Sequence, residues 1–185
     1  MEIKGVSVKS VKEFIEKNFP GRFNDWAKTL PEPSKKIFTD FIKVNEWYPL
    51  SAGLTKPLRH VGDVFFNGDW KNAVWKMGRF SADEALSGIY RIYVKFGSPR
   101  HIIDRAGRVM AAYFSNAEIK VTSEMKNQLA MQILRFDEPD EAIEYNIAGW
   151  IEGALEISGC KNTQVNIRKS LARKDAMTEY YVTWE

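Results

Sequence analysis

The two histidines are the residues of this sequence best suited to hold a metal. His101 lies near the expected start of an amphipathic helix, between Arg100 and Ile102. The positive end of a helix disfavours a charged imidazolium, so the His101 ring is expected to be neutral and able to serve as a lone axial ligand of haem iron. A surface or boundary histidine is the plainer interpretation. His60, on a helix opened by Pro57, has the same two interpretations.

Nucleophilic and acid–base chemistry find little support in the sequence. The sole cysteine, Cys160, follows Gly159 at an expected helix end, where the helix dipole raises the pKa of a thiol. A single cysteine also excludes an internal disulfide and a thiolate metal cluster. The acidic residues at 137–141 begin a helix, where carboxylates stabilise its positive end. Because no glycine-rich phosphate loop and no Gly-x-Ser-x-Gly motif is present, we expect a protein that is not an enzyme.

Charge gives no reason to expect a nucleic-acid partner. The chain has 27 lysines and arginines against 24 aspartates and glutamates, a net charge of +3. The most basic stretch, residues 91–108, is interrupted by Asp104, and a solvated face explains it better than a phosphate-binding surface. No apolar run approaches the roughly 18 residues of a membrane span, and the N-terminus lacks the apolar core of a signal peptide. We therefore expect a soluble cytoplasmic protein.

Aromatic residues make up 13% of the chain and include six tryptophans. Such rings fill a core, which is the plainer interpretation, or line an apolar pocket. A pocket is expected between the helical part and the sheet, where apolar surfaces with bulky rings cannot interlock completely. The candidate ligand-binding residues are Trp47, Trp70, Trp75, His101, Tyr113 and Trp150.

Residues 7–114 are expected to be helical. Ser10 and Ser81 each stand three residues before a glutamate, which is the pattern of a capping box at a helix start. An apolar stripe over residues 37–42, which includes Phe41, predicts a helix that ends before Pro49. The expected helices begin at Ser10, Ser34, Pro57, Trp70, Ser81 and Pro99.

Residues 117–185 are expected to form strands around one helix. Apolar and polar residues alternate in three segments, and a fourth apolar run is less regular. The short connections suit hairpins, so the strands should form an antiparallel sheet. The expected strands are residues 118–125, 128–136, 163–168 and 179–184.

Residues 140–158 carry the broad apolar stripe of a helix that covers one face of this sheet. Gly159 is placed to be its left-handed C-cap. Gly149 and Gly153 lie four residues apart on this helix and leave it free of side chains at that face. We expect the two glycines to let the helix pack closely against the sheet.

The C-terminal part carries a recognisable pattern. Residues 147–160 read IAGWIEGALEISGC, residues 163–167 read TQVNI, and residues 179–184 read EYYVTW. This pattern resembles the C-terminal half of a superfamily that contains haem nitric-oxide-binding domains, four-vinyl-reductase-type ligand-binding domains and vesicle-tethering subunits. Within it, the chain is most similar to an uncharacterised bacterial paralogous family with a Gly-Ser-Pro near mid-chain, here Gly97-Ser98-Pro99.

The resemblance implies an α+β fold in which a helical N-terminal half packs on an antiparallel sheet. A single domain, 1–185, would contain a mainly helical subdomain, 1–116, and a ββαββ subdomain, 117–185. A ligand cavity is implied between the two, with a sensory or regulatory binding role rather than catalysis.

The same resemblance bears on cofactors. Haem nitric-oxide-binding members carry Tyr-x-Ser-x-Arg on a strand, where it holds the haem propionates. Here the similar string is Tyr113-Phe-Ser115-Asn-Ala117, with alanine in place of the arginine. Four-vinyl-reductase-type domains often carry several cysteines, and this chain has only Cys160. Neither haem nor another cofactor nor a metal is therefore expected.

The expected function is that of a non-enzymatic sensory or regulatory module of bacterial signalling that binds a small apolar or aromatic molecule. One alternative is a protein–protein interaction module without a ligand, which would show an exposed apolar patch and no cavity. The other alternative is a haem-based gas sensor that uses His101 as its iron ligand.

Overall fold

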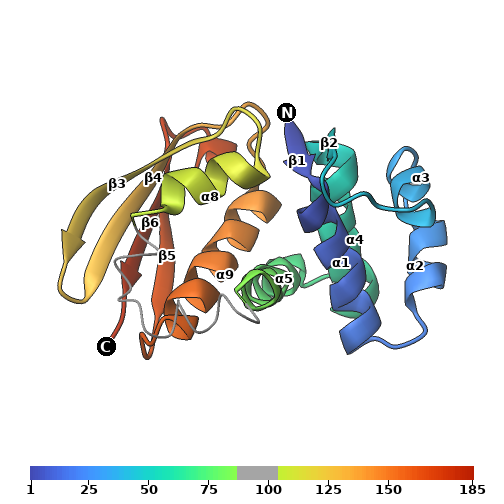
Figure 1. Cartoon of the computed structure of the whole chain (residues 1–185), viewed down its shortest axis with the longest axis horizontal. Helices are drawn as coiled ribbons and strands as arrows, with labels where there is room; N and C mark the ends of the chain where they lie inside the picture. The colour runs from blue at the N-terminus through green and yellow to red at the C-terminus, as the bar shows by residue number, and fades with distance from the viewer. Residues whose placement is uncertain (87–103) are drawn as a thin grey trace.

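The computed structural model describes residues 1–86 and 104–185 and has an α+β fold (Figure 1). The described helices are α1(Gly5–Asn18), α2(Phe23–Thr29), α3(Ser34–Thr39), a π-helical turn η1(Ser51–Thr55), α4(Lys56–Phe65), α5(Trp70–Ala85), α8(Ala106–Tyr113), α9(Glu141–Ile157) and a 3-10 turn η2(Leu171–Arg173). The described strands are β1(Glu2–Lys4), β2(Trp47–Pro49), β3(Glu118–Met125), β4(Gln128–Arg135), β5(Gln164–Lys169) and β6(Thr178–Thr183).

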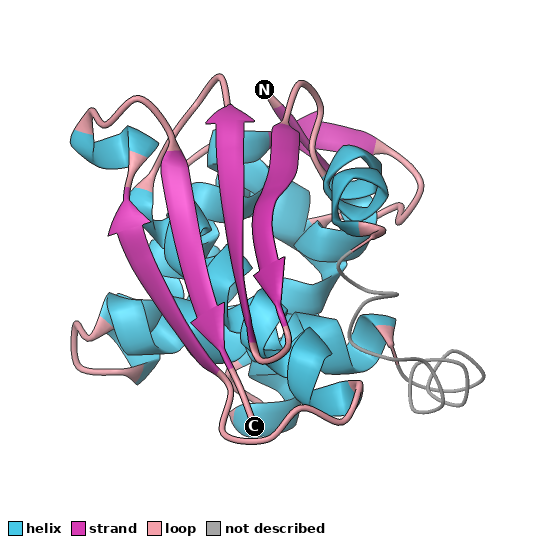
Figure 2. Ribbon diagram, turned by 90° about the vertical axis from the view of Figure 1, so that its left-hand side faces the viewer, coloured by secondary structure: helices cyan, strands magenta, loops and turns pink. Residues whose placement is uncertain are grey.

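The C-terminal half confirms the expected ββαββ arrangement. Its four strands form an antiparallel sheet in the order β3-β4-β6-β5. Leu129 of β4 pairs with Val182 of β6, and Met131 pairs with Tyr180, so these buried side chains share the inner face. Helices pack on that face, and the other face is open to solvent (Figure 2). An antiparallel sheet covered on one side gives the alternation of apolar and polar residues that the sequence shows.

Helix α9 begins and ends close to the expected positions. The Asp140 side chain caps its first turn by accepting a hydrogen bond from the backbone N–H of Ala142 at 2.7 Å. Past its C-terminus, Gly159 has φ +104°, which confirms the expected left-handed conformation.

The start of the helical half differs from the expectation. Strand β1 pairs with β2, where residues 47–49 were expected to end a helix. Both capping-box expectations are wrong, because α1 already begins at Gly5 and α5 runs through Ser81. Ser10 lies inside α1, and its hydroxyl donates to the carbonyl oxygen of Ser7 at 2.8 Å. The backbone N–H of Gly5 instead donates to Glu46 O at 2.8 Å. Glu46 directly precedes β2, so a residue distant in sequence fixes the start of α1.

Two other helices also end differently from the expectation. Helix α3 stops at Thr39, and the Phe41 side chain, expected on its apolar stripe, is 87% exposed. Helix α5 continues through Ser81, where a separate helix was expected to begin, and ends at Ala85. Pro57 does lie in the first turn of α4, as expected. The helix expected from residue 81 to 97 and the start of the helix expected from Pro99 fall largely on residues 87–103, outside the described residues.

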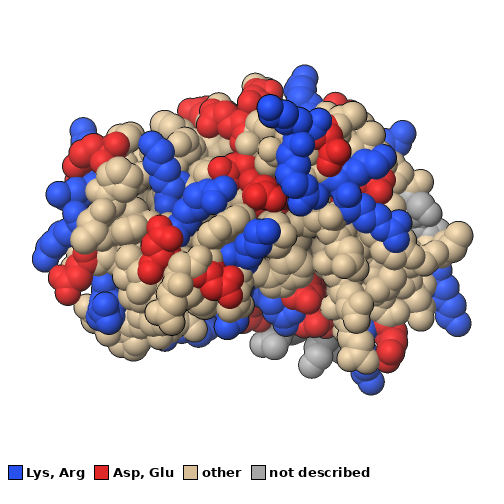
Figure 3. All heavy atoms as spheres, turned by 180° about the vertical axis from the view of Figure 1, so that it is seen from behind, with Lys and Arg blue, Asp and Glu red and all other residues tan. Residues whose placement is uncertain are grey.

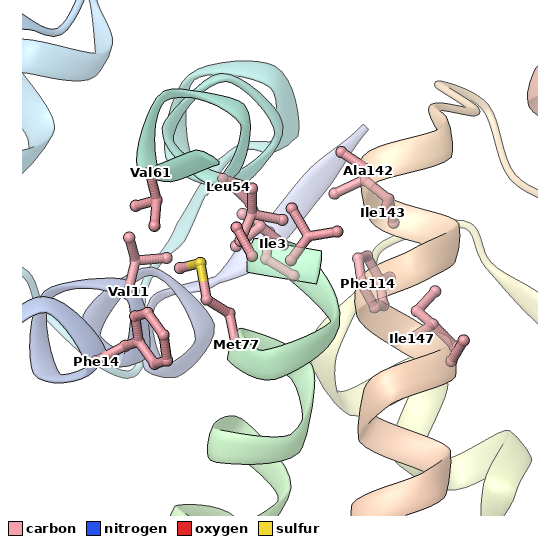
Figure 4. Packing of buried hydrophobic residues seen from close by; sticks show 14 of the residues in the cluster. Ile3, Val11, Phe14, Leu54, Val61, Met77, Phe114, Ala142, Ile143 and Ile147 are labelled. Atoms are coloured by element: carbon pink, nitrogen blue, oxygen red, sulfur yellow. The ribbon is translucent and has the colours of Figure 1, made fainter. Parts of the chain in front are cut away.

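The buried hydrophobic residues of the helices and of the sheet form one continuous cluster. Figure 4 shows part of it, where Val11 of α1, Leu54 of η1 and Met77 of α5 converge. Phe114, just after α8, and Ile147 of α9 face the same region from the C-terminal half. Between the sheet and helices α1 to α4, Figure 1 places α5, α8 and α9, so these three helices join the two halves. Within the described residues, no helix is long and apolar enough to cross a membrane.

Candidate functional site

A cavity of about 90 Å³ lies where the helical half meets the sheet. Its described wall comes from α1, η1, α4, α5, α8, β3, β4 and α9. Apolar side chains dominate the wall, among them three methionines. The lining residues are Ser7, Ser10, Val11, Leu54, Leu58, Met77, Ser81, Ala106, Val109, Met110, Tyr113, Phe114, Ile119, Leu129, Met131, Asn146, Ile147, Trp150, Ile151 and Leu155.

The crossing of α5 over α9 sets the position of two walls of this cavity. A Cβ atom at Gly78 would lie 2.0 Å from the carbonyl oxygen of Asn146, and one at Gly149 would lie 2.1 Å from that of Trp75. The two backbones therefore touch directly, which larger residues would prevent. This close contact is with α5 and not with the sheet. Gly153 also faces Arg79 and Ala82 of α5, so the expectation that the two glycines pack against the sheet is wrong for both. Met77 and Asn146 reach the cavity on either side of the crossing.

Polar contacts between side chains hold the same crossing. The amide nitrogen Nδ2 of Asn146 donates to the carbonyl oxygen of Val74 at 3.0 Å. The indole N–H of Trp75 donates to Glu152 at 2.7 Å, and Arg79 forms ion pairs with both Glu152 and Glu156. These contacts join positions more than 70 residues apart in the sequence and fix the walls relative to each other.

The polar groups on the described part of the cavity wall are few and uncharged. Within the described residues, no lysine, arginine, aspartate, glutamate or histidine lines the cavity. Tyr113 is the last residue of α8, and burial raises the pKa of its hydroxyl above the usual range. The hydroxyl is therefore protonated at neutral pH, so it is able both to donate and to accept a hydrogen bond.

The structure brings two of the six candidate ligand-binding residues to the cavity, Tyr113 and Trp150. Trp47 lies on β2 with its ring 39% exposed and with Lys4 Nζ 4.4 Å from the ring centroid. Trp70 opens α5 and stacks under the Arg59 guanidinium, 4.5 Å from the ring centroid. Trp75, as described above, contacts Glu152. His101 lies outside the described residues.

Sequence reasoning missed the methionines Met77, Met110 and Met131, which line the cavity from three different elements. Methionine is flexible and polarisable, so it fills irregular gaps and adapts to what lies beside it. Only their placement on apolar stripes could have pointed to them, and that signal is shared with every core residue.

The other reactive residues lie away from the cavity. His60 is half-buried, with its Nε2 2.8 Å from the hydroxyl oxygen of Thr29. The same hydroxyl lies 2.7 Å from the carbonyl oxygen of Trp26, and burial lowers the pKa of the His60 ring. Cys160 is buried, and burial, rather than the expected helix dipole, is the main cause that raises the pKa of its thiol. No group of three or more described histidine, cysteine, aspartate or glutamate residues is arranged to hold a metal.

Charged side chains of both signs lie on one face of the protein. On the face seen in Figure 3, lysines and arginines are interspersed with aspartates and glutamates. This distribution agrees with the small net charge of +3.

Comparison with solved structures identifies the fold. An H-NOX protein from S. oneidensis in the Fe(II)NO ligation state aligns over 99% of this chain and 99% of its own, with a TM-score of 0.75 and 13% identity. An unliganded Fe(II) H-NOX protein from K. algicida aligns over 99% and 97%, with a TM-score of 0.72 and 11% identity. A mutant H-NOX from T. Tengcongensis aligns over 99% and 98%, with a TM-score of 0.68 and 12% identity. The chain therefore has the fold of an H-NOX domain, the haem nitric-oxide-binding type that the sequence resembles. No protein-family model and no curated protein sequence matches it.

The described residues do not fit a haem. A cavity of about 150 Å³ holds one benzene ring, whereas the cavity here measures about 90 Å³ and a haem macrocycle is several times larger than benzene. Haem needs an axial ligand, and its propionates need donors of hydrogen bonds or positive charge. Neither a histidine nor a cationic side chain is among the described lining residues.

Proposed function

We propose that this chain is a non-enzymatic binding module that holds a small, mostly apolar molecule in the cavity between its helices and its sheet. The observation that carries the proposal is the cavity itself, whose described wall is apolar with a few uncharged polar groups. Small-molecule sites in proteins are concave, mostly apolar, and contain a few polar groups that orient the ligand. A solved structure with this fold is an H-NOX protein in the Fe(II)NO ligation state, which supports a small-molecule site in the same fold.

A sensory role requires that a change in the cavity be transmitted to the protein surface. Helix α9 is able to transmit it, because it contacts both. Trp150 of α9 lines the cavity, while Glu144, earlier on the same helix, is buried and accepts hydrogen bonds from the hydroxyls of Ser170 and Thr178. The backbone N–H of Ala172 also donates to Glu144, at 3.2 Å. The connection from β5 to β6 is therefore fixed to the helix that lines the cavity. The arrangement offers a route from the cavity to this segment, and a role in bacterial signalling is what the sequence resemblance implies.

Native mass spectrometry of the protein as purified tests whether a small molecule is retained. A tryptophan-fluorescence titration with toluene then tests the cavity, because Trp150 is part of its wall. The variant Ala106→Phe places a ring on the cavity wall and is expected to abolish toluene binding. Its matched control, Ala111→Phe, lies on the exposed side of the same helix α8 and is expected to leave binding unchanged. The proposal fails if toluene binds neither wild type nor the control Ala111→Phe. It also fails if toluene binds Ala106→Phe as tightly as it binds wild type.

A second candidate function, an interaction module without a ligand, is favoured by one surface observation. The ring of Phe41 is 87% exposed, and Val44 and Trp47, a few residues later, are also exposed. The three side chains lie within seven residues of the sequence, and a contiguous exposed apolar patch marks a contact surface. If no molecule is retained and toluene does not bind, this second function takes the place of the first.

A further inference from the structure

Some polar groups on the cavity wall already form hydrogen bonds within the protein, and others do not. The Ser10 hydroxyl donates to the carbonyl oxygen of Ser7 at 2.8 Å, and the Asn146 amide nitrogen donates to Val74 O at 3.0 Å. The first bond lies within α1 and the second joins α9 to α5, so the protein already uses both groups. In the described part of the chain, no residue forms a hydrogen bond with the hydroxyls of Tyr113, Ser7 and Ser81. Of these three, Tyr113 has the longest side chain and is the only one that also adds an aromatic ring to the described wall. Tyr113 is half-buried on this wall, so its hydroxyl is free to form a hydrogen bond with a ligand or with water.

The charge of the wall limits the charge of the ligand. No described lining residue is ionisable in the physiological range, and burial keeps the Tyr113 hydroxyl protonated by raising its pKa. An ionised ligand would lose its hydration here without gaining a counter-ion, which is strongly unfavourable. The wall is therefore matched to a neutral molecule.

The apolar part of the wall limits the ligand's size and favours a flat ring. The cavity measures about 90 Å³, less than the cavity of about 150 Å³ that holds benzene. The flexible side chains of Met77, Met110 and Met131 are able to move apart, and methionine sulfur makes favourable contacts with aromatic rings. Phe114 and Trp150 add ring surfaces to the same wall. One ring is therefore the largest body that modest movement of these side chains admits.

We propose that the cavity takes a neutral molecule the size of a single aromatic ring that carries one hydrogen-bonding group, and that the Tyr113 hydroxyl recognises this group. The inference rests on the proposed function and adds to it the class of ligand and a specificity-determining residue.

Toluene, phenol and benzoate form a matched set of probes, because they share one ring and differ in a methyl, a hydroxyl and a carboxylate group. Dissociation constants are measured for wild type and for Tyr113→Phe by calorimetry. Since the free phenol hydroxyl is hydrated, the readout is how the ratio of phenol to toluene dissociation constants changes between the two proteins. Loss of one hydrogen bond is expected to raise this ratio about tenfold in Tyr113→Phe. Benzoate is expected to show no saturable binding to either protein.

Two controls separate recognition from folding. Tyr113→Phe removes only a hydroxyl that no described residue contacts, so toluene should bind this variant within about twofold of wild type. Tyr145→Phe removes a hydroxyl from a ring that packs on Trp70 and Trp75, outside the cavity, and should leave the ratio unchanged.

The outcomes distinguish this inference from the proposed function. If toluene binds and the ratio is the same in wild type and Tyr113→Phe, the role of Tyr113 is refuted while the cavity remains a binding site. If benzoate binds as tightly as phenol, the neutral class is refuted. If none of the three probes binds wild type, the binding function of the cavity itself is refuted.

Discussion

Replacing Gly149 with alanine places a methyl group inside the crossing of α5 and α9. The new Cβ atom would lie 2.1 Å from the carbonyl oxygen of Trp75 and 2.9 Å from its carbonyl carbon. Both neighbours are backbone atoms, so neither can rotate away as the end of a flexible side chain could. The helices must therefore move apart, which lengthens and weakens the hydrogen bond from Asn146 to Val74.

The magnitude follows from the distance that has to be gained. Real Cβ atoms essentially never approach another heavy atom closer than 3.0 Å, so the gap of 2.1 Å must widen by about 0.9 Å. Overpacking of this kind costs about 1–3 kcal/mol and sometimes more. Alanine is also the better helix former, by about 1 kcal/mol. Because the clash is between backbones, we take the upper end of the cost and expect Gly149→Ala to lower the free energy of unfolding by about 2 kcal/mol.

Gly153→Ala is the matched control on the same helix. Its Cβ would meet Ala82 Cβ and the backbone of Arg79 at 3.3 Å, so the neighbours need to give way by only a few tenths of an ångström. The gain in helix propensity is the same, and the net change should stay within about 1 kcal/mol of zero. Urea unfolding followed by tryptophan fluorescence measures both variants, provided that their m-values agree. The reasoning is refuted if Gly149→Ala is as stable as Gly153→Ala.

Three further expectations concern single side chains. Glu144→Ala should lower the free energy of unfolding by about 3 kcal/mol, because the hydroxyls of Ser170 and Thr178 lose their buried acceptor; an unchanged urea midpoint would contradict this. Burial lowers the pKa of His60 below 6.5, so on acidification the unfolded chain binds a proton before the folded chain does. From about pH 8 to about pH 5.5, wild type should therefore lose more unfolding free energy than His60→Gln, and equal losses would count against it. Protein incubated with haem should gain no Soret band at about 400 nm, whereas a strong band that disappears in His101→Ala would overturn this expectation.

The C-terminal half was predictable because its sheet has one covered and one open face. Each strand then alternates between buried and exposed positions, and the sequence of β6 shows this directly, with Tyr180 and Val182 buried and Tyr181 half-buried. The cap of α9 is also local, since Asp140 and Gly159 act through atoms within a few residues.

The boundaries in the helical half were less predictable because they depend on contacts between distant segments. Serine followed three residues later by glutamate occurs at Ser10 and Ser81, yet both lie inside helices. The start of α1 is instead fixed by Glu46, whose carbonyl oxygen accepts from the N–H of Gly5. No local pattern contains this pairing of β1 with β2.

The site was predictable as a place but only partly as a set of residues. Its position between helices and sheet follows from two apolar surfaces that carry bulky rings, and Tyr113 and Trp150 do lie there. Trp75 does not, because its indole N–H finds a carboxylate partner in Glu152 on another helix. A tryptophan on an apolar stripe therefore gives no sign of whether its ring faces the cavity or a polar neighbour elsewhere.

The two sides of the cavity differ in how they can respond to a ligand. On one side, Gly78 and Gly149 bring two helix backbones into direct contact, and the ion pairs of Arg79 hold them there. A backbone contact of this kind has no rotamers to exchange, so it resists displacement. On the other sides, methionines such as Met110 and Met131 change rotamer at little cost. Adaptation to an incoming ring therefore falls on the methionines, and the position of α9 stays fixed until the ligand exceeds what they can accommodate. Under the proposed function, a ligand small enough for the methionines to accommodate leaves α9 in place. A larger ligand displaces α9, and with it Glu144 and the surface segment bound to Glu144.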